Sequence, residues 1–196
     1  MVDTGKVVEV FETEAQRELA QTAARESIVL LKNEDDLLPL DKEVDSLAVI
    51  GPSADSTRNL LGDYAYSAHV ESSENTIPVV SILDGIKNKV SGDTEINYAK
   101  GCGIMDFSKD NFDEAVAAAE KSDIAVVAVG GRSGLSGMGG EEEERDDTVD
   151  FSEVSFTSEM IHTTDTTGEH HDRTDLKLPG GQKELLQAIH KTGTPV

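Results

Sequence analysis

The chain has 196 residues, of which 39 are Asp or Glu and 17 are Lys or Arg, so its formal net charge is -22. A surface this negative repels nucleic-acid phosphates and anionic lipid headgroups, which excludes a general nucleic-acid or membrane-surface binder. The single cysteine, Cys102, excludes an internal disulfide framework. No apolar run approaches the roughly 18 to 20 residues that a membrane-spanning helix needs. The first residues carry acids and no apolar segment typical of a secretory signal, so we expect a cytoplasmic protein.

The acidic residues are spread along the whole chain, and two interpretations compete. One is intrinsic disorder, which high net charge and few aromatic residues favour. The other is a folded protein whose carboxylate-rich surface suits a high-salt cytoplasm, where salt screens the self-repulsion. Apolar runs at 27–31, 46–51 and 124–131 favour the folded interpretation.

Apolar periodicity and turn residues predict an alternation of helices and strands. In chain order we expect a helix at 13–31, a strand at 46–51, a short helix near Asp55, a helix at 79–90, a strand at 94–102, a helix at 110–121, a strand at 124–131 and a helix at 178–193. Strands that alternate with helices of this length indicate βαβ units and an α/β fold with a mainly parallel sheet.

Three helix ends carry capping signals. Thr13 begins the first helix, and Gln16 three residues later completes a capping-box pattern. Asp110 is the predicted cap of the helix at 110–121, whose acidic first turn suits the positive end of the helix dipole. Pro179 suits the first turn of the last helix.

The segment 133–175 is rich in Gly, Ser, Thr and acidic residues and shows no sustained period. A loop of this length inside a compact domain is uncommon, and such loops are usually functional or disordered. It leaves the carboxyl end of the predicted strand at 124–131, the end at which open α/β sheets bind ligands. We therefore expect the active-site loop here. Its chemistry-bearing residues are Glu141, Glu142, Glu143, Glu144, Asp146, Asp147, His162, Glu169, His170, His171, Asp172 and Arg173.

The spacing of the glycines, histidines and acids in this loop matches no cofactor-binding motif, so we expect no cofactor. Its glycines form neither a dinucleotide-binding nor a P-loop pattern. His162, His170 and His171 cluster with acids, but adjacent histidines on a loop cannot easily face one ion, and no metal-binding spacing is present, so we expect no metal. The acidic run 141–144 is by itself typical of a solvated charge cluster. We interpret Cys102 as a buried structural thiol rather than a nucleophile.

Several runs stand in the order found in glycoside hydrolase family 3. They are AARESIVLLKNEDDLLPL (23–40), LAVIGPSAD (47–55), LLGDY (60–64), NYAKGC (97–102), IAVVAVGGRSGL (124–135) and GEHHDRTDLKLPGGQKELLQAI (168–189). Together they resemble the second domain of the family's β-glucosidases and β-xylosidases, over residues 13–196. In the family this domain is an α/β sandwich that follows a (β/α)8-type barrel. The resemblance therefore implies a three-layer α/β sandwich with a mainly parallel sheet, preceded by a linker or disordered lead at 1–12.

The resemblance also implies a retaining β-glycosidase that hydrolyses O-glycosyl bonds with two carboxylates. The family's nucleophile is an Asp on the barrel, and no residue of this chain matches it. Glu169 matches the acid/base, within the family's Gly-Glu-x-x-Asp-Arg pattern that Asp172 and Arg173 complete. Asp172, Arg173 and Asp63 are implied as substrate-binding residues. The alternative acid/base residues are Glu141, Glu142, Glu143 and Glu144, which match an earlier acidic element of other members.

The expected partners are a β-linked glycoside and a family 3 barrel domain, in cis or in trans, with no cofactor. Because residues 192–196 end where a further strand is expected, we expect an internal portion of a longer β-glucosidase-like enzyme, inactive alone. The alternative is a non-catalytic interaction or sugar-binding subunit that docks onto a separately encoded barrel.

Overall fold

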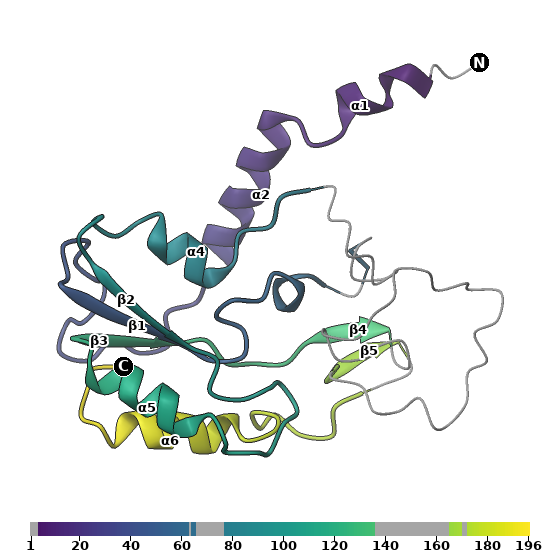
Figure 1. Cartoon of the computed structure of the whole chain (residues 1–196). Coiled ribbons are helices and arrows are strands. Elements are labelled where there is room, and N and C mark those ends of the chain that lie inside the picture. Colours follow the sequence, from purple (N-terminus) through teal and green to yellow (C-terminus); the bar gives the residue numbers. More distant parts are fainter. Residues whose placement is uncertain (1–3, 63, 66–76, 136–164, 170–171) are drawn as a thin grey trace. The chain divides into compact units, whose positions relative to one another are not determined.

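A computed structural model describes residues 4–62, 64–65, 77–135, 165–169 and 172–196 (Figure 1). The chain divides into two compact units, residues 1–40 and residues 41–196. Within the described residues, no helix combines the length and the apolarity needed to cross a membrane.

The first unit contains the short 3-10 helix η1 (Thr4–Lys6), the helix α1 (Val7–Val10) and the helix α2 (Glu14–Ser27). The predicted cap of α2 is confirmed: the Gln16 amide donates to the Thr13 hydroxyl (3.3 Å), and the Thr13 amide donates to the Gln16 side chain (3.0 Å). The helix ends four residues before the predicted residue 31, because Ile28 adopts an extended conformation (φ -73, ψ 126). Ile28 and the next residue, Val29, are both β-branched, and such side chains lose rotamer freedom in a helix.

The second unit is built on a parallel sheet, which confirms the predicted α/β class. Its strands are β1 (Ser46–Ile50), β2 (Glu95–Ala99) and β3 (Ile124–Val127), in the spatial order β2-β1-β3. The central strand β1 pairs in parallel with both neighbours. A central parallel strand is covered on both faces, and four of the five residues of β1 are accordingly buried.

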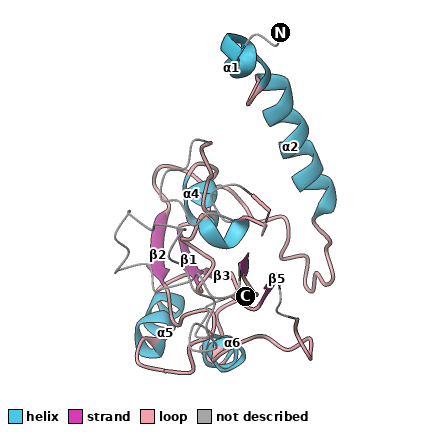
Figure 2. Cartoon of the chain, turned by 90° about the vertical axis from the view of Figure 1, so that its right-hand side faces the viewer, coloured by secondary structure: helices cyan, strands magenta, loops and turns pink. Residues whose placement is uncertain are grey.

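Helices cover both faces of this sheet, which gives three layers (Figures 1 and 2). The helix α4 (Ile82–Lys87) lies on one face, while α5 (Phe112–Glu120) and α6 (Gln182–His190) lie on the other. Because side chains alternate along a strand, Ala48 and Ile50 of β1 pack toward α5 and α6. This arrangement confirms the three-layer sandwich.

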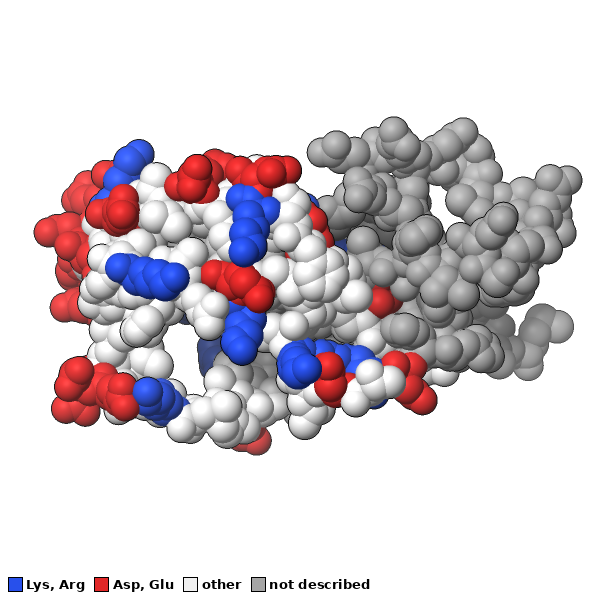
Figure 3. Space-filling view, turned by 90° about the horizontal axis from the view of Figure 1, so that it is seen from below, with Lys and Arg blue, Asp and Glu red and all other residues white. Residues whose placement is uncertain are grey.

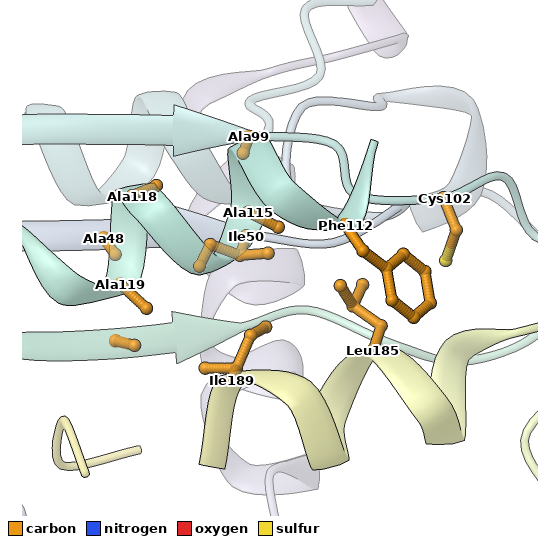
Figure 4. Packing of buried hydrophobic residues seen from close by; sticks show 11 residues of the cluster. Ala48, Ile50, Ala99, Cys102, Phe112, Ala115, Ala118, Ala119, Leu185 and Ile189 are labelled. Carbon is orange, nitrogen blue, oxygen red and sulfur yellow. The ribbon is translucent and has the colours of Figure 1, made fainter. Parts of the chain in front are cut away.

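The main core lies between the sheet and the pair α5–α6 (Figure 4). Alanines on α5 bring its backbone close to the strands, and Leu185 and Ile189 of α6 fill the remaining space. Gly101 has φ 72, and a Cβ there would lie 2.7 Å from Leu185, so the loop after β2 requires glycine at this point. The cluster consists of Ala48, Ile50, Ala99, Cys102, Phe112, Ala115, Ala118, Ala119, Ala125, Leu185 and Ile189.

Several predicted elements are present but shorter. The predicted cap Asp110 is wrong, because α5 begins after Asn111, which makes no side-chain capping bond. The short helix expected near Asp55 is instead the 3-10 turn η2 (Arg58–Leu60). The helix at 79–90 is reduced to α4, whose cap is Ser81: its hydroxyl accepts from the Asp84 amide (3.1 Å).

Charged side chains are distributed over the outer face of the α5–α6 layer (Figure 3). In α5, Asp113, Glu114 and Glu120 are exposed, and in α6 Lys183 and Glu184 are exposed. Acids and bases are interspersed on this face in Figure 3, so the excess of carboxylates does not form one uniform patch there.

Leu185 provides a test of the core. We expect Leu185→Ala to lower the free energy of unfolding by about 2–5 kcal/mol, because it leaves a cavity between α6, α5 and the loop after β2. The matched control is Leu176→Ala, since Leu176 is 101% exposed and its truncation is expected to change stability by less than about 0.5 kcal/mol. Urea unfolding at a fixed salt concentration measures both, and equal losses would contradict this placement of the core.

Candidate active site

In the strand order β2-β1-β3, the chain places β2 on one side of β1 and then β3 on the other side. The carboxyl end of β1 is therefore a topological switch point, and α/β proteins bind ligands at such points. Here the loops that follow β1 and β3 run side by side. The Ala128 amide donates to the Ile50 carbonyl (2.7 Å), and the Ser53 amide donates to the Ala128 carbonyl (3.3 Å). Gly51 has φ 119, and a Cβ there would lie 2.2 Å from the Ala128 oxygen, so this close approach requires glycine.

The loop after β1 presents Arg58 at this switch point. Its neighbour Asn59 donates from Nδ2 to the Pro52 carbonyl (3.1 Å), and the Asn59 amide donates to the Ser56 hydroxyl (3.3 Å). These bonds tie the 3-10 turn η2 back to the end of β1. The Arg58 side chain is 17% exposed, so it is directed largely into the protein.

The loop after β3 is held by Gln182, a fully buried residue in the first turn of α6. Its Oε1 accepts from the Gly130 amide (2.8 Å), and its Nε2 donates to the carbonyls of Gly130 (2.9 Å) and Ile104 (2.9 Å). The side-chain amide thus satisfies both backbone groups of Gly130, as a neighbouring strand would. Gln182 therefore joins the loop after β3 to α6 and to the loop after β2.

A buried ion pair lies just beyond this point. Arg132 donates from Nε to Asp165 Oδ1 at 2.6 Å, and the two side chains are 8% and 1% exposed. Arg58 Nη2 lies 3.9 Å from the same Asp165 oxygen. One carboxylate is therefore shared by guanidinium groups from the loops after β1 and after β3.

Next to this ion pair, two short strands pair in parallel: β4 (Ser133–Leu135) and β5 (Thr167–Glu169). Leu135 is opposite Glu169 in this register. The ion pair and these strands bring together residues 132–135 and 165–169, which we call the neck. The neck joins the two ends of the segment 136–164.

Glu169, the predicted acid/base, is therefore the last residue of β5, and Leu135 is its partner in β4. Asp172 is exposed, three residues further on. Arg173 donates to the Lys177 carbonyl and lies 3.7 Å from Asp175, so its guanidinium group ties together residues 173–177 between β5 and α6. The remaining predicted residues lie outside the described residues: Asp63, Glu141, Glu142, Glu143, Glu144, Asp146, Asp147, His162, His170 and His171.

Cys102 is buried in the main core beside Phe112, as Figure 4 shows. Burial, and next the charge of Asp106, raise the pKa of its thiol to about 11, although Lys100 acts in the opposite direction. Because the nucleophilic form of cysteine is the thiolate, this environment disfavours a nucleophilic role at neutral pH. In the part of the chain that is described, no group of three or more His, Cys, Asp or Glu side chains is arranged to hold a metal ion.

Five residues of this region were not predicted from the sequence: Arg58, Asn59, Arg132, Asp165 and Gln182. Asp165 lies in a polar run with no period, and Gln182 occupies a helix position next to apolar residues. The one available signal was the block LPGGQ (178–182), which contains Gln182 and belongs to the same conspicuous run, 168–189, as the predicted acid/base.

A family model described as the glycosyl hydrolase family 3 C-terminal domain matches residues 28–196. The chain belongs to this family. Among curated relatives, a β-xylosidase of Formosa agariphila is 41% identical over 94% of this chain and 21% of the relative. A periplasmic β-glucosidase of Salmonella typhimurium is 32% identical over 94% of this chain and 22% of the relative. The chain thus spans about a fifth of the length of these relatives.

Solved structures agree with this assignment. A family 3 exo-β-xylosidase, XlnD, in complex with a xylobiose aziridine probe matches with a TM-score of 0.61 and 28% identity, over 92% of this chain and 18% of that chain. A β-glucosidase involved in saponin metabolism from intestinal bacteria matches with a TM-score of 0.64 and 24% identity, over 98% of this chain and 25% of that chain. The second likeness concerns the fold alone.

Gln182 provides a test of the switch-point geometry. We expect Gln182→Leu to lower the free energy of unfolding by about 3 kcal/mol or more, because it leaves the Gly130 amide, the Gly130 carbonyl and the Ile104 carbonyl without this partner. The control is Gln187→Leu on the exposed face of the same helix, which is expected to change stability by less than about 0.5 kcal/mol. Chemical unfolding measures both, and a neutral Gln182→Leu would contradict the role given to this amide.

Proposed function

We propose that this chain acts as the second domain of a retaining β-glycosidase and supplies its general acid/base, Glu169. The observation that carries the proposal is the position of the Gly168-Glu169 pair. It ends the strand β5, beside the loops that leave the carboxyl ends of β1 and β3. Ligands of open α/β sheets bind outside these ends. Membership of the family supports the reaction class.

In the proposed reaction, a carboxylate on a barrel domain attacks the anomeric carbon while Glu169 gives its proton to the leaving glycosidic oxygen. In the second step the ionised Glu169 takes a proton from water, and that water displaces the enzyme carboxylate from the sugar. The two carboxyl groups of a retaining enzyme lie about 5–5.5 Å apart. The barrel, joined in cis or supplied in trans, therefore has to face the neck.

Asp172 and Arg173 have different proposed roles: Asp172 contacts the sugar, and Arg173 shapes the loop. Asp172 is exposed three residues after Glu169, where its carboxylate is accessible to sugar hydroxyls. The Arg173 guanidinium is engaged by the Lys177 carbonyl and by Asp175. We propose that Arg173 shapes the loop that carries Asp172 toward the sugar.

The proposed substrates are β-linked glucosides and xylosides. Curated relatives named as a β-xylosidase and a β-glucosidase each match over 94% of this chain. The 41% identity to the β-xylosidase exceeds the 32% identity to the β-glucosidase, so both aryl β-xylosides and aryl β-glucosides are used in the test.

The isolated chain is expected to hydrolyse neither substrate measurably, because no residue in it matches the family's nucleophile. Activity is then sought by replacing the matching part of the Formosa agariphila β-xylosidase with residues 28–196 of this chain. In that hybrid, Glu169→Gln is expected to lower kcat about 10²–10⁴-fold for poor leaving groups, which need a proton, and far less for dinitrophenyl glycosides.

The matched control is Glu184→Gln, which removes an exposed carboxylate of α6 and is expected to leave kcat unchanged. Turnover by the isolated chain that Glu169→Gln abolishes would refute the need for a barrel. An equal loss for good and poor leaving groups would refute the acid role of Glu169. The same leaving-group pattern in a Gln variant of Glu141, Glu142, Glu143 or Glu144 would move that role to the earlier cluster.

A further inference from the structure

We infer that Arg132 and Asp165 are positioning residues for the proposed acid/base: their buried ion pair closes the neck and fixes the strand that ends at Glu169. We call this pair the clamp. The inference rests on the proposed function for the role of Glu169, but the geometry of the clamp is independent of that role.

The clamp joins parts of the chain that are distant in sequence. Arg132 follows β3, and Asp165 precedes β5, with their side chains 2.6 Å apart at Nε and Oδ1. A buried carboxylate is strongly unfavourable unless it is paired and hydrogen-bonded. Since Asp165 is 1% exposed, the Arg132 guanidinium is part of what allows it to be buried in this position.

Backbone and hydroxyl bonds reinforce the clamp on both sides of Arg132. The Thr166 amide donates to the Arg132 carbonyl (2.7 Å), and the Thr166 hydroxyl donates to the same carbonyl (3.0 Å). The Arg132 amide donates in turn to the Thr166 hydroxyl (3.1 Å). The residues 165–166 are thus fixed against Arg132 by both main-chain and side-chain contacts.

The strands β4 and β5 need such support. Each contains three residues, and they form a two-stranded sheet of their own. Isolated two-stranded pairs are marginally stable at best in water. The contacts of the clamp directly precede the first pair of the ladder, Ser133 and Thr167, and so set the register that brings Glu169 opposite Leu135.

The space around the clamp fits an aspartate closely. A Cβ on Gly134 would lie 2.2 Å from Asp165 Oδ2, and a Cβ on Gly131 would lie 2.2 Å from Thr166 Oγ1. Both glycines therefore leave room for the side chains of residues 165 and 166. A longer acid at position 165 would have to displace the backbone of β4.

A small displacement of Asp165 is expected to displace Glu169 as well, because the two residues are close in the chain. Glu169 is four positions after Asp165, which is about 13 Å of extended chain at roughly 3.3 Å per residue. A misplacement of about 1 Å in a catalytic group can lower the rate about 10²-fold. We therefore expect clamp variants to impair proton transfer before they impair the fold of the main sheet.

The first test uses hydrogen exchange in the chain itself, with Asp165→Ala and the nearly isosteric Asp165→Asn. Amides of residues 133–135 and 166–169 are expected to exchange about 10–100-fold faster in Asp165→Ala and by a smaller factor in Asp165→Asn. Amides of β1 and α6 are expected to keep their original rates. The control Asp113→Asn removes an exposed carboxylate of α5 and is expected to change neither set.

Unchanged exchange in the neck of both Asp165 variants would overturn the inference. Equal acceleration throughout the sheet of both variants would also overturn it, because the pair would then support the whole fold and not the neck. If Asp165→Ala fails to fold, the milder Asp165→Asn decides between these outcomes.

The second test uses the hybrid enzyme described above. Asp165→Asn is expected to lower kcat about 10-fold for poor leaving groups, with KM and the turnover of dinitrophenyl glycosides unchanged, and Asp165→Glu is expected to lower kcat further. An equal loss for good and poor leaving groups would overturn the link to proton transfer. If Glu169→Gln itself shows no leaving-group dependence, the proposed function fails, while faster exchange in the neck still supports the clamp.

Discussion

The rest of the second unit depends on the pairing of β1 with a parallel neighbour on each side. Because β1 is central, its residues are buried on both faces, and helices must cover the sheet above and below. The same pairing sends the loops after β1 and β3 to one edge of the sheet. The close contact at Gly51 and Ala128 then fixes how near these loops come to each other.

Polar groups of the switch point are organised by two kinds of contact. Gln182 supplies its side-chain amide to the backbone of Gly130 and Ile104, and it does so from the side of α6 that faces the main core. Arg132 and Arg58 bring positive charge to Asp165 from the loops after β3 and β1. An uncharged side chain, Gln182, therefore connects α6 to the loop after β3. Charged side chains, Arg58 and Arg132, connect the loops after β1 and β3 to Asp165, which precedes β5.

Much of the fold could be predicted from the sequence. Apolar runs ending in glycine predicted β1 and β3, an alternating pattern predicted β2, and the alternation of strands with helices predicted the parallel sheet. Helix ends were less predictable, because they depend on local competition: Ile28 prefers extended backbone, and Asn111 replaces Asp110 at the start of α5. The neck was not predictable from periodicity, since Arg132 and Asp165 are 33 residues apart and neither belongs to a repeating pattern.

The candidate site, like the fold, could be predicted from the sequence only in part. Glu169 was reached through a resemblance in the block GEHHDR, whereas nothing in its spacing marked it as an acid. The residues that fix its strand were missed, because the fold alone reveals which loop residues become buried. A charged residue in a glycine-rich loop is usually solvated, and only the sheet geometry makes Asp165 an exception.

The closed neck has a further consequence for how this domain can vary. A segment whose two ends are already joined has little effect on the framework when its length changes, since doubling a flexible loop costs only about 0.6 kcal/mol. The chain between Leu135 and Asp165 is therefore a natural place for insertions and deletions. Domains built on this sheet can therefore differ in the length of that segment, while the parallel strands and their helices keep one arrangement.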